Sequence, residues 1–502
     1  MIRTGPIGSV LVANRGEIAL RICRTLAEME IRSVVVASDP DREALHALSA
    51  DRTIFIGGES PAESYLDQGK ILAAAREAEV DAVHPGYGFL AENAAFARTV
   101  EEAGLVWIGP PAAAIAAMGD KLVARETMAK AGVPVIPGSP VLTEAGAARR
   151  EAERIGCPLM LKAAAGGGGK GMRVVRDPAE LPAALEAARR ESQGAFGSDA
   201  VFLEKYIERP RHIEFQVLAD SLGNTVHLFE RECSIQRRHQ KIVEETPSVA
   251  LDGELRERMG KAAVEAARAA GYVNAGTVEF ILGQDREFYF LEMNTRLQVE
   301  HPITEMTCGV DLVRSQVAVA RGEELPWRQE EIGRRGHAIE CRVYAEDPAN
   351  NFFPSSGRVT ALAEPAGPGV RNDTGIYEGA EVSTFYDPML SKLVVFGEDR
   401  ESAAARMVRA LRGYQVLGLA TTIPFLAEVI AHPAFLAGDT CTDFIPRHME
   451  GWKLRDEAAA EAALLAALAQ PDTTGGGRSA AGGERGAAAF DVWREVGRRG
   501  NR

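Results

Sequence analysis

The sequence has few features of a secreted or membrane protein. Its six cysteines are scattered through 502 residues without a CxxC pair or a metal-ligand spacing, which argues against a disulfide framework. No stretch approaches the roughly 20 consecutive apolar residues of a membrane span, and the first residues lack the apolar core of a signal peptide. We therefore expect a cytoplasmic protein with reduced thiols and no membrane partner.

The chain has fewer basic than acidic residues, 57 lysines and arginines against 71 aspartates and glutamates. The formal net charge is -14 and the isoelectric point is about 5.3, which disfavours a nucleic-acid partner. One compact basic run, RRHQK at residues 237–241, stands out against this background. We interpret it as an anion site, with a solvated surface cluster as the alternative.

The length of the chain predicts about three domains. Over residues 1–118, short β-rich runs alternate with helical patterns, as a doubly wound parallel sheet requires. The expected strands begin near Ser9, Ser33, Arg52, Asp81 and Leu105. Ligands of such sheets bind beyond the carboxyl ends of the strands. The first turn lacks a dinucleotide fingerprint, so we do not expect NAD binding.

The densest set of polar side chains follows an apolar run in FYFLEMNTRLQVEHP, residues 288–302. These polar residues alternate along the chain: Glu292, Asn294, Arg296, Gln298 and Glu300. If the strand stays extended, side chains two residues apart share a face. The five groups would then project together into one site.

The preceding run, TVEFILG, and the turn residues 283–286 complete a predicted β-hairpin. Counting outward from the turn places Glu279 opposite about position 290, and therefore diagonal to Glu292. Two carboxylates and the amide oxygen of Asn294 are suitable ligands for Mg²⁺ or Mn²⁺. Two acids on a solvated hairpin face are the alternative.

A second cluster lies in CPLMLKAAAGGGGKGMRVV, residues 157–175. An apolar strand ends in Lys162, and a glycine run and another short strand follow. Backbone N–H groups of glycine can approach an anion closely, so we expect a hinged flap over nucleotide phosphates. The loop is not a Walker loop, because that spacing and the helix after it are missing. A flexible connector is the alternative.

Together these motifs resemble an ATP-grasp ligase, and more closely biotin carboxylase, the ATP-using component of biotin-dependent carboxylases. The similar segments, in the order of the family, are ANRGEIALRI, HPGYGFLAENAAFA, RHQKIVEE, EMNTRLQVEHPITEM and HAIECRVYAED. The resemblance extends from about Val10 to about Pro446. In the flap the family often has serine, a further glycine and arginine, where this chain has Ala164, Ala165 and Lys170. This departure bears on kinetics rather than on the reaction class.

The resemblance implies an α/β architecture with three parts. A Rossmann-like N-terminal domain would occupy residues 1–118, an ATP-grasp domain residues 119–335 with a mobile lid at about 135–206, and a mixed α/β C-terminal domain residues 336–446. We expect the last two domains, without the lid, to pack as one body. Residues 447–502 lie outside the resemblance and are typical of a helix followed by a flexible linker.

The implied reaction is ATP-dependent carboxylation of a biotin ureido nitrogen. Bicarbonate would attack the γ-phosphate of ATP to give carboxyphosphate, which then delivers CO₂ to biotin; such phosphoryl transfer needs positioning and charge neutralisation. The implied ATP contacts are Lys121, Lys162, Gly167, Gly168, Gly169, Glu204, Lys205, Ile207, His212, Gln236, His239, Glu279 and Glu292. The implied metal ligands are Glu279, Glu292 and Asn294.

The resemblance also implies sites for bicarbonate and biotin. The bicarbonate site would consist of Lys241, Arg296, Gln298, Val299 and Glu300. Glu300 is the candidate general base, with an ion pair to Arg296 as the alternative. Arg342 would stabilise the ureido oxygen of deprotonated biotin, with Tyr87 lining the same pocket. The catalytic groups would thus be Glu300, Arg296, Arg342 and Lys241.

No Met-Lys dipeptide, the family's context for attached biotin, occurs in the sequence. The resemblance therefore implies that biotin is a substrate on a separate biotin carboxyl carrier protein and that one or more carboxyltransferase subunits are further partners; it also implies a homodimer. Acetyl-CoA carboxylase is the leading assignment, with a pyruvate, propionyl-CoA or other acyl-CoA carboxylase as the alternative. The NTRLQVEHP and HAIECR segments disfavour another ATP-grasp carboxylate ligase. A regulatory nucleotide-binding protein without catalysis is disfavoured because Lys241, Arg296 and Glu300 are all present.

Overall fold

The computed structural model describes residues 4–142, 145–163, 172–196, 199–238 and 240–454. Of the predicted ATP contacts, Gly167, Gly168, Gly169 and His239 lie outside the described residues. The substituted flap positions and the extension beyond residue 454 also lie outside them.

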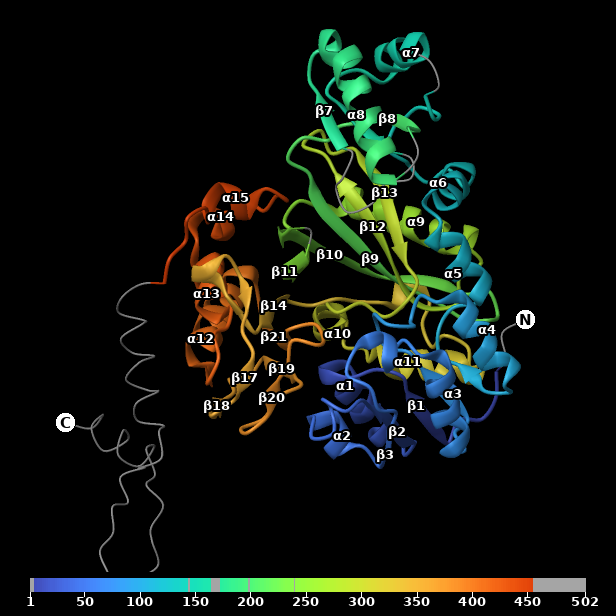
Figure 1. The fold of residues 1–502 in the computed structure, drawn as a ribbon, viewed down its shortest axis with the longest axis vertical. Coiled ribbons are helices and arrows are strands. Elements are labelled where there is room, and N and C mark those ends of the chain that lie inside the picture. Colours follow the sequence, from blue (N-terminus) through green and yellow to red (C-terminus); the bar gives the residue numbers. More distant parts are fainter. Residues whose placement is uncertain (1–3, 143–144, 164–171, 197–198, 239, 455–502) are drawn as a thin grey trace, which may run out of the picture. The chain divides into compact units, whose positions relative to one another are not determined.

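The N-terminal segment forms a five-stranded parallel sheet with strand order β3-β2-β1-β4-β5 (Figure 1). Its strands are β1 (Ser9–Val12), β2 (Arg32–Ala37), β3 (Arg52–Phe55), β4 (Ala82–His84) and β5 (Val106–Trp107). Its helices are α1 (Gly16–Glu28), α2 (Leu45–Ser49), α3 (Gln68–Glu77), α4 (Ala94–Glu102) and α5 (Ala112–Gly119). In α1 the apolar side chains of Ile18, Ile22 and Leu26 are buried, as the helical spacing predicts. The doubly wound sheet is confirmed.

A second sheet has eight strands in the order β13-β12-β9-β10-β11-β14-β21-β19. Their bounds are β9 (Arg211–Ala219), β10 (Thr225–Arg237), β11 (Gln240–Thr246), β12 (Asn274–Leu282), β13 (Phe288–Asn294), β14 (His337–Tyr344), β19 (Val370–Thr374) and β21 (Met389–Gly397). Strand β11 pairs antiparallel with β14, so hydrogen bonding continues across the expected domain boundary at residue 335. The two segments therefore form one body, as expected; the boundary itself remains a prediction.

The segment predicted to be a lid has a three-stranded sheet of its own, in the order β7-β6-β8. Its elements are β6 (Leu159–Ala163), β7 (Met172–Val175), β8 (Val201–Lys205), α7 (Ala145–Ile155) and α8 (Leu181–Phe196). Leu159, Leu161 and Leu203 are fully buried in a core that is separate from those of the larger sheets. The two strands predicted on either side of the glycine loop pair antiparallel.

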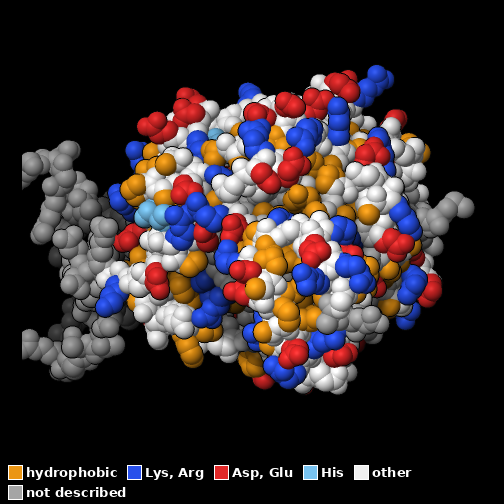
Figure 2. Space-filling view, turned by 90° about the horizontal axis from the view of Figure 1, so that it is seen from above, with side chains coloured by type: hydrophobic (Ala, Val, Ile, Leu, Met, Phe, Trp, Pro, Cys, Tyr) orange, Lys and Arg blue, Asp and Glu red, His pale blue; other side chains and the backbone are white. Residues whose placement is uncertain are grey.

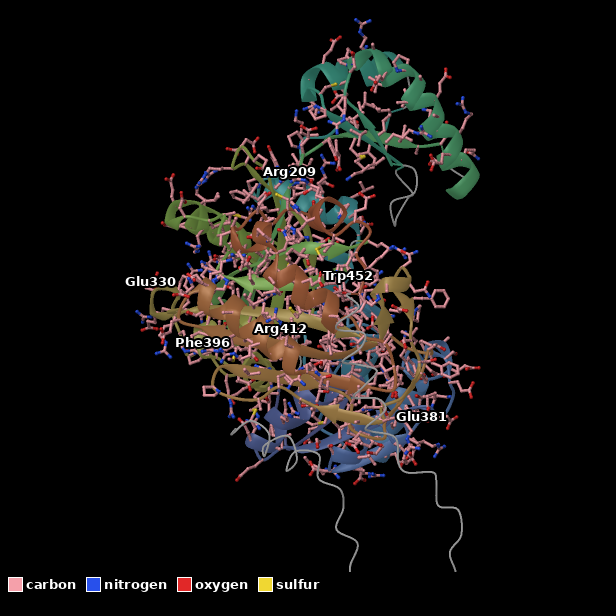
Figure 3. The ribbon with its side chains drawn as sticks, turned by 90° about the vertical axis from the view of Figure 1, so that its left-hand side faces the viewer. Arg209, Glu330, Glu381, Phe396, Arg412 and Trp452 are labelled. Carbon is pink, nitrogen blue, oxygen red and sulfur yellow. The ribbon has the colours of Figure 1, made fainter. Side chains whose placement is uncertain are left out.

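Further helices and short strands surround the large sheet. The helices are α6 (Lys121–Lys130), α9 (Gly253–Ala269), α10 (His301–Cys308), α11 (Leu312–Arg321), α12 (Arg400–Gly413), α13 (Ile423–Ala431), α14 (Pro433–Leu436) and α15 (Phe444–His448). The short strands are β15 (Glu346–Asp347), β16 (Phe353–Pro354), β17 (Gly357–Arg358), β18 (Ala361–Ala363), β20 (Glu381–Val382) and β22 (Gln415–Leu417). Trp452, which is labelled in Figure 3, lies near the end of the described chain. It packs edge-on against Phe425, and its indole N–H donates to Glu428 at 2.9 Å.

The cysteines agree with the expectation of reduced thiols. Acidic and basic side chains are interspersed on the face shown in Figure 2. All six cysteines belong to the described part of the chain, and all are free thiols. Within the described ranges, no helix combines the length and apolar character needed to cross a bilayer.

Candidate active site

The hairpin that carries the predicted metal ligands has a register that simple counting does not give. Phe280 pairs with Phe290, and Glu279 pairs with Glu292, because a bulge after Glu279 leaves Leu291 as an extra residue in β13. The prediction that Glu279 lies opposite position 290 is therefore wrong. The two carboxylates lie directly across the hairpin rather than diagonally, which brings them closer together than expected.

The strand also ends earlier than the alternating pattern suggests. β13 stops at Asn294, and an irregular segment leads to Glu300, the N-cap residue of α10. Pro302 in the first turn favours this helix start. The polar side chains converge through hydrogen bonds rather than through strand alternation: the Arg296 guanidinium donates to Asn294 Oδ1 at 2.8 Å and to Gln298 Oε1 at 3.1 Å.

Lys241, on β11, lies at the centre of the cluster. Its Nζ is 2.5 Å from Glu214 Oε2, 2.7 Å from Glu279 Oε1 and 2.7 Å from Glu300 Oε1. Burial opposes the charge of Lys241, but the three carboxylates outweigh it and hold the lysine pKa well above its usual range. Sequence reasoning missed Glu214. Its signal was the alternation of His212 and Glu214 in RHIEF, which places both on one face once this segment is known to be a central strand.

Glu300 is fully buried between two cations. Besides Lys241, Arg342 Nη2 lies 2.8 Å from Glu300 Oε2, while Arg342 Nε donates to Glu244 Oε1 at 2.6 Å. Burial opposes ionisation of Glu300, but the charges of Lys241, Arg342 and Arg231 outweigh it and hold the pKa of Glu300 well below its usual range. Glu300 is therefore a carboxylate at neutral pH.

Arg296 is oriented by an acid from the N-terminal segment. Its Nε donates to Glu92 Oε2 at 2.9 Å, and the Thr295 backbone N–H donates to Glu92 Oε1 at 3.1 Å. Among the described residues the ion-pair partners of Glu300 are Lys241 and Arg342, so the alternative ion pair between Glu300 and Arg296 is not formed. Glu92 lies in the HPGYGFLAENAAFA motif, but the sequence analysis predicted no role for this side chain.

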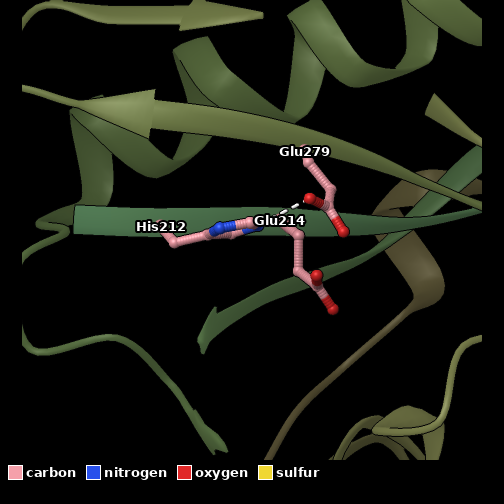
Figure 4. Close-up of side chains that lie close together, drawn as sticks. All are labelled: His212, Glu214 and Glu279. Atoms are coloured by element: carbon pink, nitrogen blue, oxygen red, sulfur yellow. Dashed lines mark ion pairs between the residues drawn. The ribbon is translucent and has the colours of Figure 1, made fainter. Parts of the chain in front are cut away.

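Figure 4 shows His212, Glu214 and Glu279 side by side. His212 Nε2 lies 2.7 Å from Glu279 Oε2, and His212 Nδ1 lies 3.0 Å from the Gln236 amide nitrogen. Ligand atoms of the three residues lie within 4.8 Å of one another, a spacing that suits a metal ion. However, the ammonium of Lys241 already lies between Glu214 and Glu279 and compensates their charge.

The predicted metal pair, Glu279 and Glu292, fits a divalent cation better. Glu292 is open to solvent on one side. The surrounding protein limits its hydration, and this together with the charge of Glu279 raises the pKa of Glu292. A cation bound by oxygen ligands would relieve this repulsion. The amide group of Asn294 donates to Glu279 Oε1 at 2.9 Å and its oxygen accepts from Arg296, so it orders the pair from the side.

The predicted nucleotide contacts on the lid form a second group. Lys162 and Glu204 form an ion pair across β6 and β8, and Arg125 Nη1 lies 3.1 Å from the other oxygen of Glu204. The Lys205 ammonium instead donates to two backbone carbonyls, those of Gly156 and Cys157, at 3.1 Å each. Lys121 is exposed at the start of α6, and Ile207 is half-buried just after β8.

Two further contacts involve Glu17, which follows β1 at the edge of the parallel sheet where ligands were expected, and Lys392, which had no predicted role. The Tyr87 hydroxyl donates to Glu17 on α1. The carbonyl of Val299 accepts a hydrogen bond from Lys392 Nζ at 3.0 Å. In the basic run of residues 237–241, Arg237 forms an ion pair with Glu346 at 2.6 Å. Lys241 is the residue of this run that lies at the centre of the site.

Comparison with known proteins identifies the family. Three family descriptions match in succession: "Biotin carboxylase, N-terminal domain" at residues 6–115, "Carbamoyl-phosphate synthase L chain, ATP binding domain" at 120–328, and "Biotin carboxylase C-terminal domain" at 340–447. Biotin carboxylase from Nostoc sp. is 52% identical over 437 residues, which cover 87% of this chain and 98% of the relative. The chain belongs to the biotin carboxylase family.

Other relatives of this biotin carboxylase serve different carboxylases. A pyruvate carboxylase subunit from Methanothermobacter thermautotrophicus is 52% identical over 443 residues, covering 88% of this chain and 90% of that protein. A solved structure of the biotin carboxylase domain dimer of 2-oxoglutarate carboxylase from Hydrogenobacter thermophilus, in complex with MgADP, ADP and bicarbonate, aligns with a TM-score of 0.82 and 45% identity. The alignment covers 90% of this chain and 99% of that one.

The family assignment settles the coarse predictions. The chain is an ATP-dependent carboxylase of the ATP-grasp ligase class, with the expected biotin carboxylase fold. The predicted activity, carboxylation of biotin as one half-reaction of a larger carboxylase, is confirmed at the level of the family.

Proposed function

We propose that the buried cluster around Lys241 is where this biotin carboxylase brings together ATP, bicarbonate and biotin, as the first half-reaction of an acetyl-CoA carboxylase. The observation that carries the proposal is the convergence of Lys241 and Arg342 on the two oxygens of Glu300, at 2.7 and 2.8 Å. Arg296 is linked to the cluster by hydrogen bonds through Gln298 and Glu279. Such a site can bind a small anion and move a proton at a single carboxylate.

ATP would lie between the lid and the hairpin. Lys121 and Lys162 would neutralise its phosphates with the amides of Gly167, Gly168 and Gly169. Adenine and ribose would contact the remaining predicted nucleotide residues, which are Glu204, Lys205, Ile207, His212, Gln236 and His239. Because the Lys205 ammonium donates to two backbone carbonyls of the lid, we expect Lys205 to contact the nucleotide through its backbone.

Glu279 and Glu292 would hold Mg²⁺ or Mn²⁺, with Asn294 beside them. The metal would neutralise the phosphate charge that develops during phosphoryl transfer. The direct cross-strand pairing of the two carboxylates supports this role. The raised pKa of Glu292 supports it as well, because burial and the charge of Glu279 disfavour the ionised Glu292 carboxylate, which a bound cation would stabilise.

Bicarbonate would bind between the Arg296 guanidinium, Lys241, the Gln298 amide and the backbone of Val299. One of its oxygens would attack the γ-phosphorus, and ADP would leave as the P–O bond breaks. Glu300 would accept the bicarbonate proton. Its depressed pKa makes it a weak base at rest, but the negative charge of bicarbonate beside Lys241 weakens the positive field on Glu300 and raises its basicity.

Carboxyphosphate would then break down to CO₂ and phosphate, the released phosphate would accept the proton of the biotin nitrogen, and a C–N bond would form between that nitrogen and CO₂. Arg342 would stabilise the negative charge that this leaves on the ureido oxygen, with Tyr87 lining the pocket. The Arg342 fork supports this role, because its orientation is fixed on Glu244 at 2.6 Å and on Glu300 at 2.8 Å.

The acceptor and the partners are part of the proposal. We propose that a separate carrier protein presents biotin to this chain, and the second partner that we assign is a carboxyltransferase. A cytoplasmic homodimer in fatty acid biosynthesis is the leading assignment. A pyruvate, propionyl-CoA or other acyl-CoA carboxylase is the alternative, which the equal identity to a component of a pyruvate carboxylase supports.

The test is ATP cleavage measured with and without bicarbonate and free biotin. We expect ADP release to require Mg²⁺ and bicarbonate and to rise when biotin is added. A rate of ADP release that does not depend on bicarbonate and rises when an amine acceptor is added would contradict the proposed function. The carboxylated carrier can then be offered separate carboxyltransferase and acyl-CoA pairs, and the pair that consumes it identifies the acceptor.

A further inference from the structure

Lys392, on β21, is a fully buried lysine that the reaction described above does not use. In the large sheet it lies directly opposite Arg342 on β14 and opposite Asp373 on β19. Directly opposed residues of neighbouring strands project from the same face of a sheet. Lys392 therefore stands beside the arginine assigned to biotin, on the face that α10 covers.

The ammonium of Lys392 contacts groups next to the proposed reaction site. Its Nζ donates to the Val299 carbonyl at 3.0 Å and lies 3.2 Å from Glu17 Oε2. Asp373 is more distant, at 4.0 Å. Burial of an ammonium is costly unless it is paired and hydrogen-bonded, so these contacts hold Lys392 and its partners in fixed positions.

The first partner of Lys392 is the Val299 carbonyl, in the turn of residues 298–301 that carries part of the proposed bicarbonate site, here called the bicarbonate turn. The Val299 carbonyl belongs to the peptide group that joins Val299 to Glu300. A hydrogen bond to this oxygen fixes the plane of that peptide, and with it the direction of the Glu300 side chain. From the other side His301 Nδ1 lies 2.7 Å from the Gln298 carbonyl, so the whole turn is held at two adjacent peptides.

The second partner of Lys392 is Glu17, which holds the hydroxyl group of Tyr87 in the proposed biotin pocket. Glu17 accepts the hydroxyl hydrogen bond of Tyr87 through Oε1, while its other oxygen faces Lys392. Burial raises the pKa of Glu17, and the charge of Lys392 is the main influence that opposes this rise. Without Lys392 the carboxyl would favour its protonated form and would lose its strength as an acceptor for Tyr87.

We propose that Lys392 is a positioning residue that couples the bicarbonate turn to the biotin pocket, through Val299 on one side and through Glu17 and Tyr87 on the other. The proposal rests on the proposed function of the site. It assigns Lys392 no contact with ATP, which would lie between the lid and the hairpin.

The test compares Lys392→Met with the wild-type protein in steady-state assays of ADP release. Methionine keeps the length of the side chain but removes its charge and its donors. Because displacements of about 1 Å at a reacting group reduce rates by up to about 100-fold, we expect KM for bicarbonate and for free biotin to rise roughly tenfold or more. KM for ATP should stay within about twofold.

The matched control is Arg256→Met. Arg256 pairs with buried Glu230 at 2.9 Å, and Arg334 also holds that acid at 3.0 Å, so this variant loses a comparable ion pair away from the site. We expect it to lower the melting temperature and leave all three KM values unchanged. A double-mutant cycle with Tyr87→Phe adds a second readout: the effects of the two substitutions on KM for biotin should be non-additive, because both break the same chain of contacts.

Each outcome decides between distinct statements. If the wild-type protein shows no bicarbonate-dependent ADP release, the proposed function is wrong. If it does, and Lys392→Met changes the three KM values equally or not at all, the positioning role is wrong. If Lys392→Met does not fold, Glu17→Gln decides: a rise in KM for biotin with unchanged KM for ATP supports the coupling, and an unchanged KM for biotin overturns it.

Discussion

Replacement of Glu300 by glutamine tests the assignment of the general base most directly. Glutamine has nearly the same shape, so the change removes the charge and the proton-accepting oxygen without opening a cavity. Lys241 keeps Glu214 at 2.5 Å and Glu279 at 2.7 Å, and Arg342 keeps Glu244 at 2.6 Å. The neighbouring cations therefore stay compensated, and we expect the cluster to remain assembled.

The expected magnitude follows from these contacts. Loss of a positioned general base reduces a rate by about 10² to 10⁴-fold, which corresponds to about 3 to 5 kcal/mol in the barrier. Two charge-assisted hydrogen bonds to Glu300 are weakened, which lowers the free energy of unfolding by a few kcal/mol, on the order of 2 to 4. The affinity for ATP should change less than about threefold, because Glu300 is not one of the predicted ATP or metal contacts and Lys241 keeps its ion pair with Glu279.

The assay is biotin-stimulated ADP release at several bicarbonate concentrations, with ATP binding measured separately by calorimetry. The matched control is Glu245→Gln, which removes another buried carboxylate, one that pairs with His337 at 2.8 Å and Arg400 at 2.7 Å away from the site. It should lose stability and keep the biotin-stimulated rate. A Glu300→Gln protein whose rate stays within about threefold of wild type would refute the reasoning.

Three further substitutions test other parts of the site. Glu292→Gln should raise the Mg²⁺ concentration for half-maximal ADP release about tenfold or more, while Glu287→Gln, at the exposed residue just before the same hairpin strand, should not; equal effects would contradict the metal assignment. Lys162→Met should raise KM for ATP about tenfold with KM for bicarbonate unchanged, and a selective effect on bicarbonate would contradict its assignment to the phosphates. Burial raises the pKa of Glu244 to about 7 from an ordinary 4.5, so its proton stabilises the fold fully below about pH 4.5, and this contribution is lost as the pH rises through about 7. Glu244→Gln should flatten the loss of stability between about pH 5 and about pH 7, measured as denaturant midpoints, and an unchanged slope would exclude this titration.

The site depends on a balance of buried charges rather than on any single pair. Glu214 is shared by Lys241 and Arg231, and Arg231 is itself fully buried, with its Nε 2.6 Å from Glu214 Oε1. Breaking one partner of such a network leaves another charge buried and unpaired. Shape-matched neutral replacements disturb this balance least, and the buried ion pairs of Arg256 and Glu245 provide controls away from the site.

Local pattern was sufficient for the parts of the fold that short segments specify. The five N-terminal strands, the amphipathic spacing of α1 and the strands around the glycine loop all follow from periodicity, because burial of one face is a local requirement. The alternating polar side chains of residues 292–300 were expected to share one face of an extended strand. Instead β13 ends at Asn294, and Arg296 contacts Asn294 and Gln298 through hydrogen bonds. The five sequence motifs and their order along the chain resembled the biotin carboxylase family closely enough to predict the reaction.

The tertiary structure decided what pairs across strands and between distant segments. Whether Glu279 faces position 290 or Glu292 depends on a bulge in the pairing of β12 with β13, and counting residues outward from the turn does not reveal this bulge. The partners Glu92, Glu214 and Lys392 come from segments far from the turn at Glu300, and no spacing along the chain relates them to it. By itself the sequence determined which chemical groups are present and which local elements carry them. Their distances, and hence the ionisation of Glu300, were set by folding, because buried charges interact through space rather than along the chain.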